Sequence, residues 1–166
     1  MTDQTISVRL LAAGDEAADE SELGGVRDRC MIDGADTDGR FALVQHLFAP
    51  KALAAPMHRH RNEDEFTYVL NGRIGAVIEG HEVVAEAGDL LFKPRGQWHT
   101  FWNAGDEPAV CLELISPAGL EELFRSFASL TEPPTPEVLA DLAIEYGCEI
   151  DFEATLPLVE RLGLVF

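Results

Sequence analysis

Short apolar runs alternate with turn residues through the middle of the chain. Between residues 40 and 116 the turn signals include Asn71-Gly72, Ala87-Gly88-Asp89 and Pro94-Arg95-Gly96. They recur roughly every 8–12 residues, which is typical of antiparallel strands joined by hairpins. The run Phe41–Phe48 is one such strand. The pattern predicts an all-β sandwich or barrel and disfavours a parallel fold with alternating strands and helices.

The segment before this region is predicted to add two strands, over residues 5–12 and 26–32. Between them, Gly14–Gly25 holds five acidic residues within eight positions. Such a charge cluster is typical of a solvated loop. We therefore expect the N-terminal part, residues 1–39, to contribute strands and an acidic loop to the barrel.

At Pro117 the apolar period becomes helical. Leucine and phenylalanine recur at three- and four-residue intervals, which predicts an amphipathic helix over residues 117–130. A proline-rich segment ends it. Thr135 and Pro136 then begin a second helix that ends near Gly147, and a third is expected around residues 156–162. We expect this tail, residues 117–166, to cover one end or edge of the sheet. The alternative is a tail that also forms a lid over a site or builds a dimer interface.

Composition limits the classes of partner. The 166 residues, enough for one domain, hold 30 acidic and 12 basic side chains, a net charge of −18. This charge repels phosphate backbones and anionic bilayers, so binding to nucleic acid or a membrane is disfavoured. The three cysteines are far apart, and no signal peptide or membrane-spanning run is evident, so we expect buried, reduced thiols in the cytoplasm.

Four side chains carry the candidate chemistry. His58 and His60 are two apart, so both project from one face of an extended chain, while Arg59 points away. A bend after His60 is predicted to bring Glu65 back beside them. His99 follows a tight turn. Three imidazoles and one carboxylate suit a divalent first-row metal, which leaves Fe, Mn, Ni, Cu and Zn open.

Two stretches of the chain resemble the signature motifs of the cupin superfamily. They are His58-x-His60-x4-Glu65-x6-Gly72 and Gly88-x5-Pro94-x-Gly96-x2-His99-x3-Asn103, in which nine positions match. One departure is Ala52, where the first motif often begins with glycine. The resemblance covers residues 40–116 and implies a double-stranded β-helix, or jelly roll, with one metal inside. It also implies that His58, His60, Glu65 and His99 are the ligands.

Strand periodicity suggests which side chains share the face of the metal. Counting by two predicts a substrate pocket formed by Thr67, Gln97 and Phe101, although Phe101 is equally well read as barrel core. His46 is a further pocket candidate, whose facing depends on a register that the sequence does not give. The opposite face is predicted to carry Phe66, Tyr68, Trp98 and Trp102. Such an apolar face, together with the pairing common among cupins, predicts a homodimer.

The segment Ser116-Pro117-Ala118-Gly119 after a single small barrel resembles the quercetin-dioxygenase-like cupins. That resemblance implies a substrate that chelates the metal through an enol or hydroxyl group, with Glu65 acting as both ligand and base. Our hypothesis is a dioxygenase-type oxidoreductase acting on a small aromatic or enolisable compound. The alternatives are a metal-assisted isomerase or lyase, and a non-catalytic module that binds a small molecule.

Overall fold

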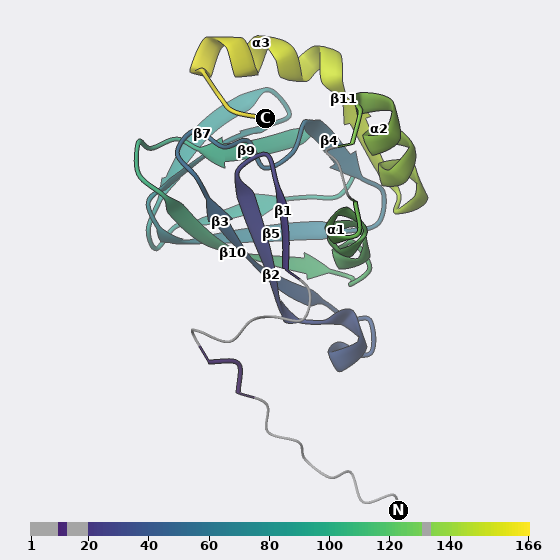
Figure 1. The fold of residues 1–166 in the computed structure, drawn as a ribbon. Coiled ribbons are helices and arrows are strands. Elements are labelled where there is room, and N and C mark those ends of the chain that lie inside the picture. The colour runs from purple at the N-terminus through teal and green to yellow at the C-terminus, as the bar shows by residue number, and fades with distance from the viewer. Residues whose placement is uncertain (1–9, 13–19, 131–133) are drawn as a thin grey trace, which may run out of the picture.

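Two antiparallel sheets face each other in the computed structural model, which describes residues 10–12, 20–130 and 134–166 (Figure 1). The six-stranded sheet has the order β1 (Glu20–Leu23), β2 (Val26–Ile32), β3 (Ala42–Phe48), β10 (Ala109–Ser116), β5 (Asp64–Asn71) and β8 (Leu90–Lys93). The five-stranded sheet has the order β11 (Cys148–Asp151), β4 (Met57–His60), β9 (His99–Asn103), β6 (Arg73–Ile78) and β7 (His81–Glu86). The predicted jelly roll with C-terminal helices is confirmed.

The core lies between the two sheets because the strands alternate buried and more exposed positions. Along β10 the buried residues are Ala109, Cys111, Glu113 and Ile115. Burial of each large apolar side chain contributes about 1.5–3 kcal/mol to folding. Several buried positions on the inner faces are polar or charged, among them Glu65, Lys93 and Glu113. None of the three cysteines forms a disulfide; Cys111 and Cys148 are buried, and Cys30 is half-buried.

The N-terminal prediction is partly wrong. Residues 5–9 of the first expected strand lie outside the described part of the chain, and residues 10–12 are not in a strand. The end of the expected acidic loop, Glu20–Leu23, is strand β1, paired with β2. Gly24 and Gly25 connect the two strands with φ of 57° and 81°. Glycine adopts such positive φ values without strain, which permits a tight hairpin where charge alone indicated a loop.

The helices α1 (Glu121–Ala128), α2 (Pro136–Glu145) and α3 (Phe152–Leu162) follow the barrel, and a short 3₁₀ helix precedes it at Gly34–Thr37. The first helix starts four residues later than predicted because Gly119 has a φ of 137°, which is not helical. The second begins as predicted, with the Val138 amide donating to the Thr135 hydroxyl.

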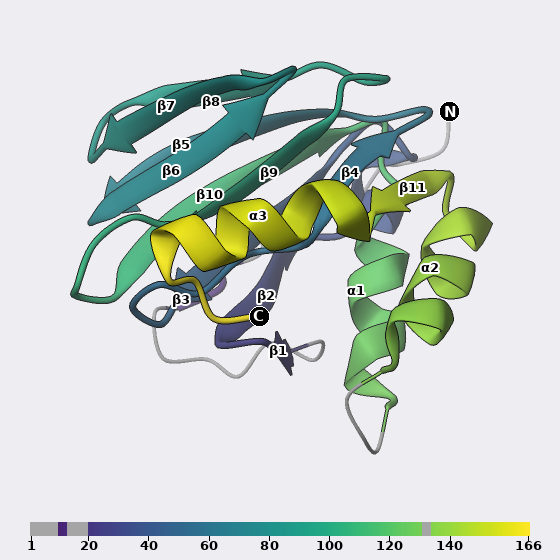
Figure 2. The same ribbon diagram turned by 90° about the horizontal axis from the view of Figure 1, so that it is seen from above.

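The third helix begins at Phe152, four residues earlier than predicted, and strand β11 before it was not predicted. The helix lies over the outer face of the five-stranded sheet (Figures 1 and 2), where Leu158 and Leu164 pack on Trp102. Trp102 therefore lies on the outer face, as predicted, but its own chain covers it. Figure 2 shows α1 and α2 at one end of the barrel instead. None of the helices in the described ranges is long and apolar enough to cross a membrane.

Candidate metal centre

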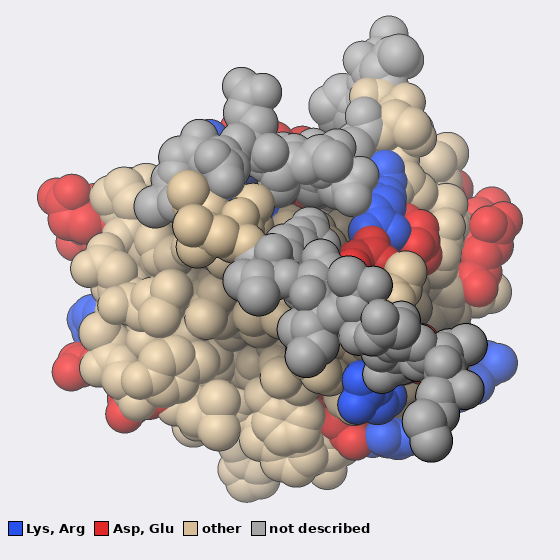
Figure 3. Space-filling view, turned by 90° about the horizontal axis from the view of Figure 1, so that it is seen from below, with Lys and Arg blue, Asp and Glu red and all other residues tan. Residues whose placement is uncertain are grey.

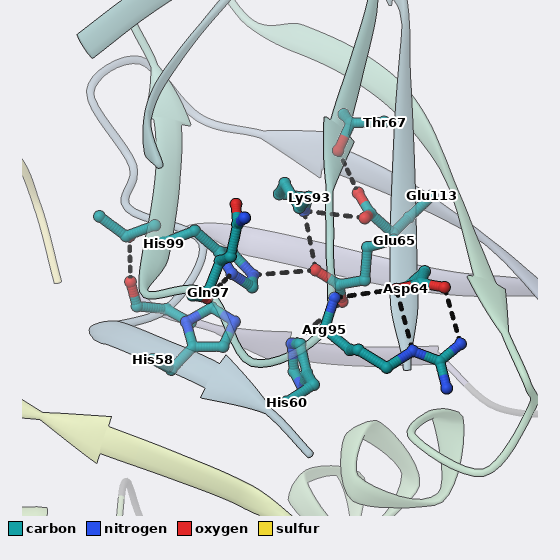
Figure 4. A network of polar contacts seen from close by, with 12 residues as sticks. His58, His60, Asp64, Glu65, Thr67, Lys93, Arg95, Gln97, His99 and Glu113 are labelled. Atoms are coloured by element: carbon teal, nitrogen blue, oxygen red, sulfur yellow. Dashed lines mark hydrogen bonds and ion pairs between the residues drawn. The ribbon is translucent and has the colours of Figure 1, made fainter. Parts of the chain in front are cut away.

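Both sheets contribute to a cluster of three histidines and one glutamate. His58 and His60 project inward from β4, and His58 pairs in register with His99 on the neighbouring β9. The predicted bend at residues 61–64 does not bring β5 back beside β4, because β5 belongs to the opposite sheet. Glu65 therefore faces the imidazoles across the barrel. One ligand atom from each of the four side chains lies within 4.8 Å of the others, and all four residues are buried (Figure 4).

Backbone carbonyls fix the tautomers of two histidines. His58 Nδ1 donates to the Pro56 carbonyl at 2.7 Å, and His99 Nδ1 donates to the Gln97 carbonyl at 3.0 Å. A carbonyl oxygen only accepts, so both Nδ1 atoms carry a proton and Nε2 has the free lone pair in a neutral ring. His99 Nε2 lies 3.0 Å from Glu65 Oε2, a pair of acceptor atoms that requires a proton or a metal cation between them.

His60, the third histidine, also indicates that the cluster needs a proton or a metal cation. Both ring nitrogens of His60 are buried without a satisfactory hydrogen bond, although Nε2 lies 3.3 Å from Glu65 Oε1. Such an orphaned polar group is costly unless a ligand satisfies it. Three imidazole nitrogens and one carboxylate are a donor set that fits a divalent transition metal. Among the described residues this is the one cluster that could hold a metal ion.

A fully buried lysine compensates the charge of the glutamate. Lys93 Nζ lies 3.0 Å from Glu65 Oε2 and 2.8 Å from Glu113 Oε1. Glu113 in turn accepts a hydrogen bond from the Thr67 hydroxyl at 2.6 Å. Burial raises the pKa of Glu65, but the charges of Lys93 and His60 outweigh it and hold that pKa well below its ordinary value. Glu65 is thus kept ionised, as a metal ligand must be.

The histidines respond differently to the same surroundings. Burial, together with the charges of His99 and His60, holds the pKa of His58 well below its ordinary value, which keeps this ring neutral. Burial also lowers the pKa of His60, but the charge of Glu65 outweighs it and raises the pKa to about 10. The cluster therefore attracts one positive charge, a proton or a metal cation.

A cavity of about 670 Å³ opens beside the cluster, and His58, His60 and Glu65 form part of its wall. Most of the remaining wall is apolar. It includes Phe124 and Phe127 of α1, and Leu139 of α2, so two helices of the tail line the cavity as well as cover the end of the barrel. The volume lies within the roughly 300–1,000 Å³ of typical small-molecule pockets.

The predicted pocket residues divide into two groups. His46 and Phe101 line the cavity, and Phe101 is also part of the core between the sheets. Thr67 and Gln97 do not line it. Thr67 faces the interior, as predicted, but its hydroxyl is bound to Glu113. Gln97 precedes β9. Its backbone carbonyl, and not its side chain, takes part in the site by orienting the His99 ring.

The other motif residues shape the backbone. Gly72, Gly88 and Gly96 all have positive φ, and a Cβ on Gly72 would lie 2.8 Å from the Ala109 side chain. The Asn103 side-chain amide donates to two backbone carbonyls, those of Ala49 and Glu107. These residues hold the turns that present the metal-site strands.

Two polar residues near the motifs point away from the cavity. Arg59 extends outward, where it pairs with Glu149 at 2.7 Å and lies over the Trp98 ring. His81 is exposed at the start of β7. Neither lines the cavity, so both serve as reference positions for experiments on the site.

Sequence reasoning missed several polar residues around the site. They are Lys93, Glu113, Asp28 and Cys148, the last of which lies opposite His60 in the β4–β11 register. One signal was present, because Glu113 interrupts the buried face of β10 between Cys111 and Ile115. An acid at such a position needs a buried partner. Which partner it has depends on the pairing of strands distant in sequence.

Comparison with known proteins gives the same fold. The tetracenomycin polyketide synthase protein TcmJ of Streptomyces glaucescens is 26% identical over 115 residues, which are 69% of this chain and 76% of TcmJ. A gentisate 1,2-dioxygenase of Ralstonia sp. is 27% identical over 116 residues, 68% of this chain but 32% of that enzyme. A solved RmlC-like cupin from Shewanella frigidimarina superposes with a TM-score of 0.57 at 21% identity, covering 69% of this chain and 96% of that one.

The family match covers the strands that carry the cluster. Residues 44–115 match the cupin domain family, and this range contains all four side chains of the metal centre. The two facing sheets, the motif spacing and the matching domain lead to one conclusion. Residues 44–115 of the chain form a cupin domain.

Proposed function

We propose that this protein is a metal-dependent oxidoreductase of the dioxygenase type, acting on a small aromatic or enolisable compound. The observation that carries the proposal is the buried cluster of three histidines and Glu65 at the wall of a large, mainly apolar cavity. The similarity to gentisate 1,2-dioxygenase supports it. The aligned residues make up only 32% of that enzyme, so a shared activity is part of the proposal.

His58, His60, Glu65 and His99 would hold one divalent ion of Fe, Mn, Ni, Cu or Zn. Such an ion, when bound, polarises a coordinated oxygen of the substrate and, if redox-active, supports chemistry with dioxygen. The backbone carbonyls that accept from Nδ1 of His58 and His99 leave both Nε2 atoms available, so these two atoms would be the donors to the ion. The apolar wall excludes water and accepts the body of the substrate.

Glu65 is the candidate base as well as a ligand. Its Oε1 faces His60, and its Oε2 contacts Lys93. The charge of Lys93 keeps Glu65 ionised, so it is ready to accept a proton from a substrate hydroxyl. The same charge weakens it as a base, because it stabilises the carboxylate more than the protonated acid. The charge of Lys93 therefore favours metal ligation over proton transfer as the main role of Glu65.

Metal content and oxygen uptake test the proposal. Purified protein is expected to carry close to one equivalent of transition metal, and a His58→Ala/His60→Ala variant is expected to lose it. His81→Ala, which changes an exposed histidine, is the matched control. Oxygen consumption is then measured with a panel of flavonols and catechols. Absence of metal after reconstitution would overturn the ligand set, whereas metal without oxygen uptake would favour an isomerase, a lyase or a binding module.

The role of Glu65 is tested separately by Glu65→Gln. The side chain keeps its shape and one neutral oxygen, so the fold is expected to survive while metal affinity falls. Isothermal titration of the metal-free variant with Mn(II), Ni(II) and, without oxygen, Fe(II) measures the change. The exposed Glu153→Gln on α3 is the control. Unchanged affinity for all three ions would remove Glu65 from the ligand set.

We further propose that the protein works as a homodimer in the cytoplasm. The three cysteines, none of which is in a disulfide, support a reducing compartment. An apolar area on the outer face of the six-stranded sheet supports a second copy of the chain as the partner.

A further inference from the structure

A histidine and an aspartate form a pair in the cavity, outside the metal centre. Asp28 on β2 and His46 on β3 are direct cross-strand neighbours, and His46 Nδ1 lies 2.7 Å from Asp28 Oδ1. Both residues line the cavity that the metal cluster also lines. His46 is only 4% exposed. The motifs and the proposed metal chemistry leave this pair without a role.

The contact with Asp28 determines what the second ring nitrogen can do. An ionised carboxylate only accepts hydrogen bonds, so His46 Nδ1 carries the proton between them. Nε2 makes no hydrogen bond with any described residue, yet it is not sealed from the cavity. This nitrogen is therefore available to a ligand. It accepts a proton when the ring is neutral and donates one when the ring is charged.

The surroundings favour the charged ring once a proton arrives. Phe48, Phe101 and Phe124 each make edge contacts with His46, at ring-centroid distances of 6.1, 6.0 and 5.9 Å. Burial among them lowers the pKa of His46, but the charge and hydrogen bond of Asp28 outweigh it, so the net pKa is raised.

Other elements packed against His46 contribute few charges. Glu113 on β10 raises its pKa and Lys93 on β8 lowers it. Its other cross-strand neighbour, Cys111, stays a neutral thiol because burial raises the thiol pKa well above its ordinary value. Asp28 is thus the partner that determines the direction in which the pKa of His46 shifts.

The distribution of polar groups in the cavity defines the ligand. Apart from the exposed Glu22 and the Cys148 thiol, the polar side chains in its wall are those of the metal cluster and those of the His46–Asp28 pair. The remainder is apolar, with five phenylalanines among aliphatic side chains, prolines and glycines. A complementary molecule has an apolar ring system, one oxygen group that binds the metal, and a second polar group at another position.

We propose that the His46–Asp28 pair is a second polar site, and that the substrate is an extended aromatic compound with hydroxyl groups at both the metal and His46. This inference rests on the proposed function and names its substrate class. At the second site the substrate O–H bond breaks and an N–H bond forms at His46 Nε2, leaving an imidazolium ion beside the Asp28 carboxylate. His46 contacts the substrate directly, and Asp28 is a positioning residue.

Binding of two probes without turnover tests the inference. Unsubstituted flavonol has all its oxygens on the central pyranone ring, whereas quercetin carries additional phenolic hydroxyls on both outer rings. Dissociation constants are measured by fluorescence for the protein loaded with redox-inactive Zn(II), and again for the metal-free protein. His46→Phe, which keeps an aromatic ring, and Asp28→Asn are each expected to weaken quercetin about tenfold and to leave flavonol unchanged.

Two readouts separate this role from a structural one. Quercetin bound to the metal-free unmodified protein is expected to show the red-shifted absorption of an ionised phenol, which disappears in metal-free His46→Phe. The pKa of His46, followed by NMR, is expected to fall in Asp28→Asn. Metal content is expected to stay the same in both variants, and the loss of quercetin affinity is expected with and without metal. The test therefore does not depend on the dioxygenase proposal.

The inference is overturned if both variants bind quercetin as the unmodified protein does, or if they lose flavonol and quercetin equally. If His46→Phe fails to fold, Asp28→Asn alone decides, because the probe selectivity and the NMR titration remain measurable. A failure of oxygen uptake with a preserved difference between the two probes would instead reject the proposed reaction and keep the second site.

Discussion

At the scale of single residues, Lys93 is the side chain that makes the centre possible. It is completely buried, and it contacts the carboxylates of Glu65 and Glu113 while its ammonium lies 3.8 Å from the centre of the Phe101 ring. Burial lowers its pKa, but the two carboxylates outweigh this and raise it, so it stays charged. One cation thus offsets two buried anions beside the metal site.

Replacement of Lys93 by methionine is expected to lower the free energy of unfolding by about 3–5 kcal/mol, because two buried carboxylates lose their shared partner. Chemical denaturation of the metal-free protein measures the loss. The double variant Lys93→Met/Glu113→Gln is expected to recover part of it, since only one of the two anions then remains. A single variant as stable as the unmodified protein would show that the buried charge is compensated elsewhere.

The His46–Asp28 pair predicts a pH-dependent contribution to stability. Pairing raises the folded-state pKa of His46 above the ordinary value of 6.5, so the contribution is fully present below about pH 6.5 and is lost as pH rises through the raised pKa. The difference in unfolding free energy between the unmodified protein and Asp28→Asn is expected to be larger near pH 5.5 than near pH 9, by on the order of 1 kcal/mol.

The control for this comparison is Asp106→Asn, since Asp106 is 92% exposed and pairs only with Lys51 among the contacts described. Its effect is expected to be small at both pH values. Equal effects of Asp28→Asn at the two pH values would contradict the pairing of a charged His46 with Asp28.

At the scale of elements, the C-terminal segment supports the strand that carries two ligands. Strand β11 pairs with β4 so that Cys148 lies opposite His60 and Ile150 opposite His58. It covers an edge of β4 that would otherwise expose unpaired backbone groups. Helix α3 follows without a loop, because Asp151 ends β11 and also caps the helix.

The Asp151 side chain accepts a hydrogen bond from the Ala154 amide at 2.9 Å. Asp151→Ala removes this cap and is expected to cost about 1 kcal/mol of unfolding free energy. Asp151→Asn, which keeps an accepting oxygen, is expected to retain most of the stability. Thermal and denaturant unfolding of the two variants decide the matter, and equal losses would assign the effect to charge and not to capping.

At the scale of the whole molecule, one face stands out as apolar. The outer face of the six-stranded sheet carries Leu43, Phe66, Tyr68, Leu90, Phe92, Leu112 and Leu114, which we call the sheet patch. Leu90 is 58% exposed and Phe92 is 49% exposed. The view from the side of this sheet is largely uncharged, with charged side chains mainly toward its rim (Figure 3). Contiguous apolar surface of this kind marks interaction sites.

We expect the sheet patch to pair two copies of the chain. Trp98 and Trp102 were predicted to belong to the apolar face but are not part of the sheet patch. Arg59 lies over the Trp98 ring, and α3 covers Trp102. The patch extends instead over β8 and β10. A self-complementary patch relates two copies by a two-fold axis.

Light scattering at micromolar concentration is expected to give about twice the 18.2 kDa of one chain. Tyr68→Glu/Leu90→Glu is expected to give the monomer, because two carboxylates per copy would be buried at the interface. Val83→Glu/Val84→Glu, which changes two similarly exposed residues on β7, is expected to leave the dimer intact. A mass of 18.2 kDa for the unmodified chain would exclude this assembly.

The sequence by itself determined the features that depend on near neighbours. The strand over Phe41–Phe48, the turn glycines and the Thr135 cap are local, and each was predicted close to where it lies. The histidine spacing on β4 is local too, because two residues two apart share a face of any strand. The family motifs added Glu65 and His99 to the same group.

Only the tertiary structure decided which distant segments meet. It placed Glu65 in the sheet opposite His58 and His60, paired Asp28 with His46, and set Lys93 between two carboxylates. These contacts depend on strand register and on the assignment of strands to sheets, which arise from packing between segments far apart in the chain. A slip of one residue would turn any of these side chains to the other face. Local pattern therefore predicted the candidate ligands. Tertiary packing decided which charged side chains surround them and how the cavity beside them is formed.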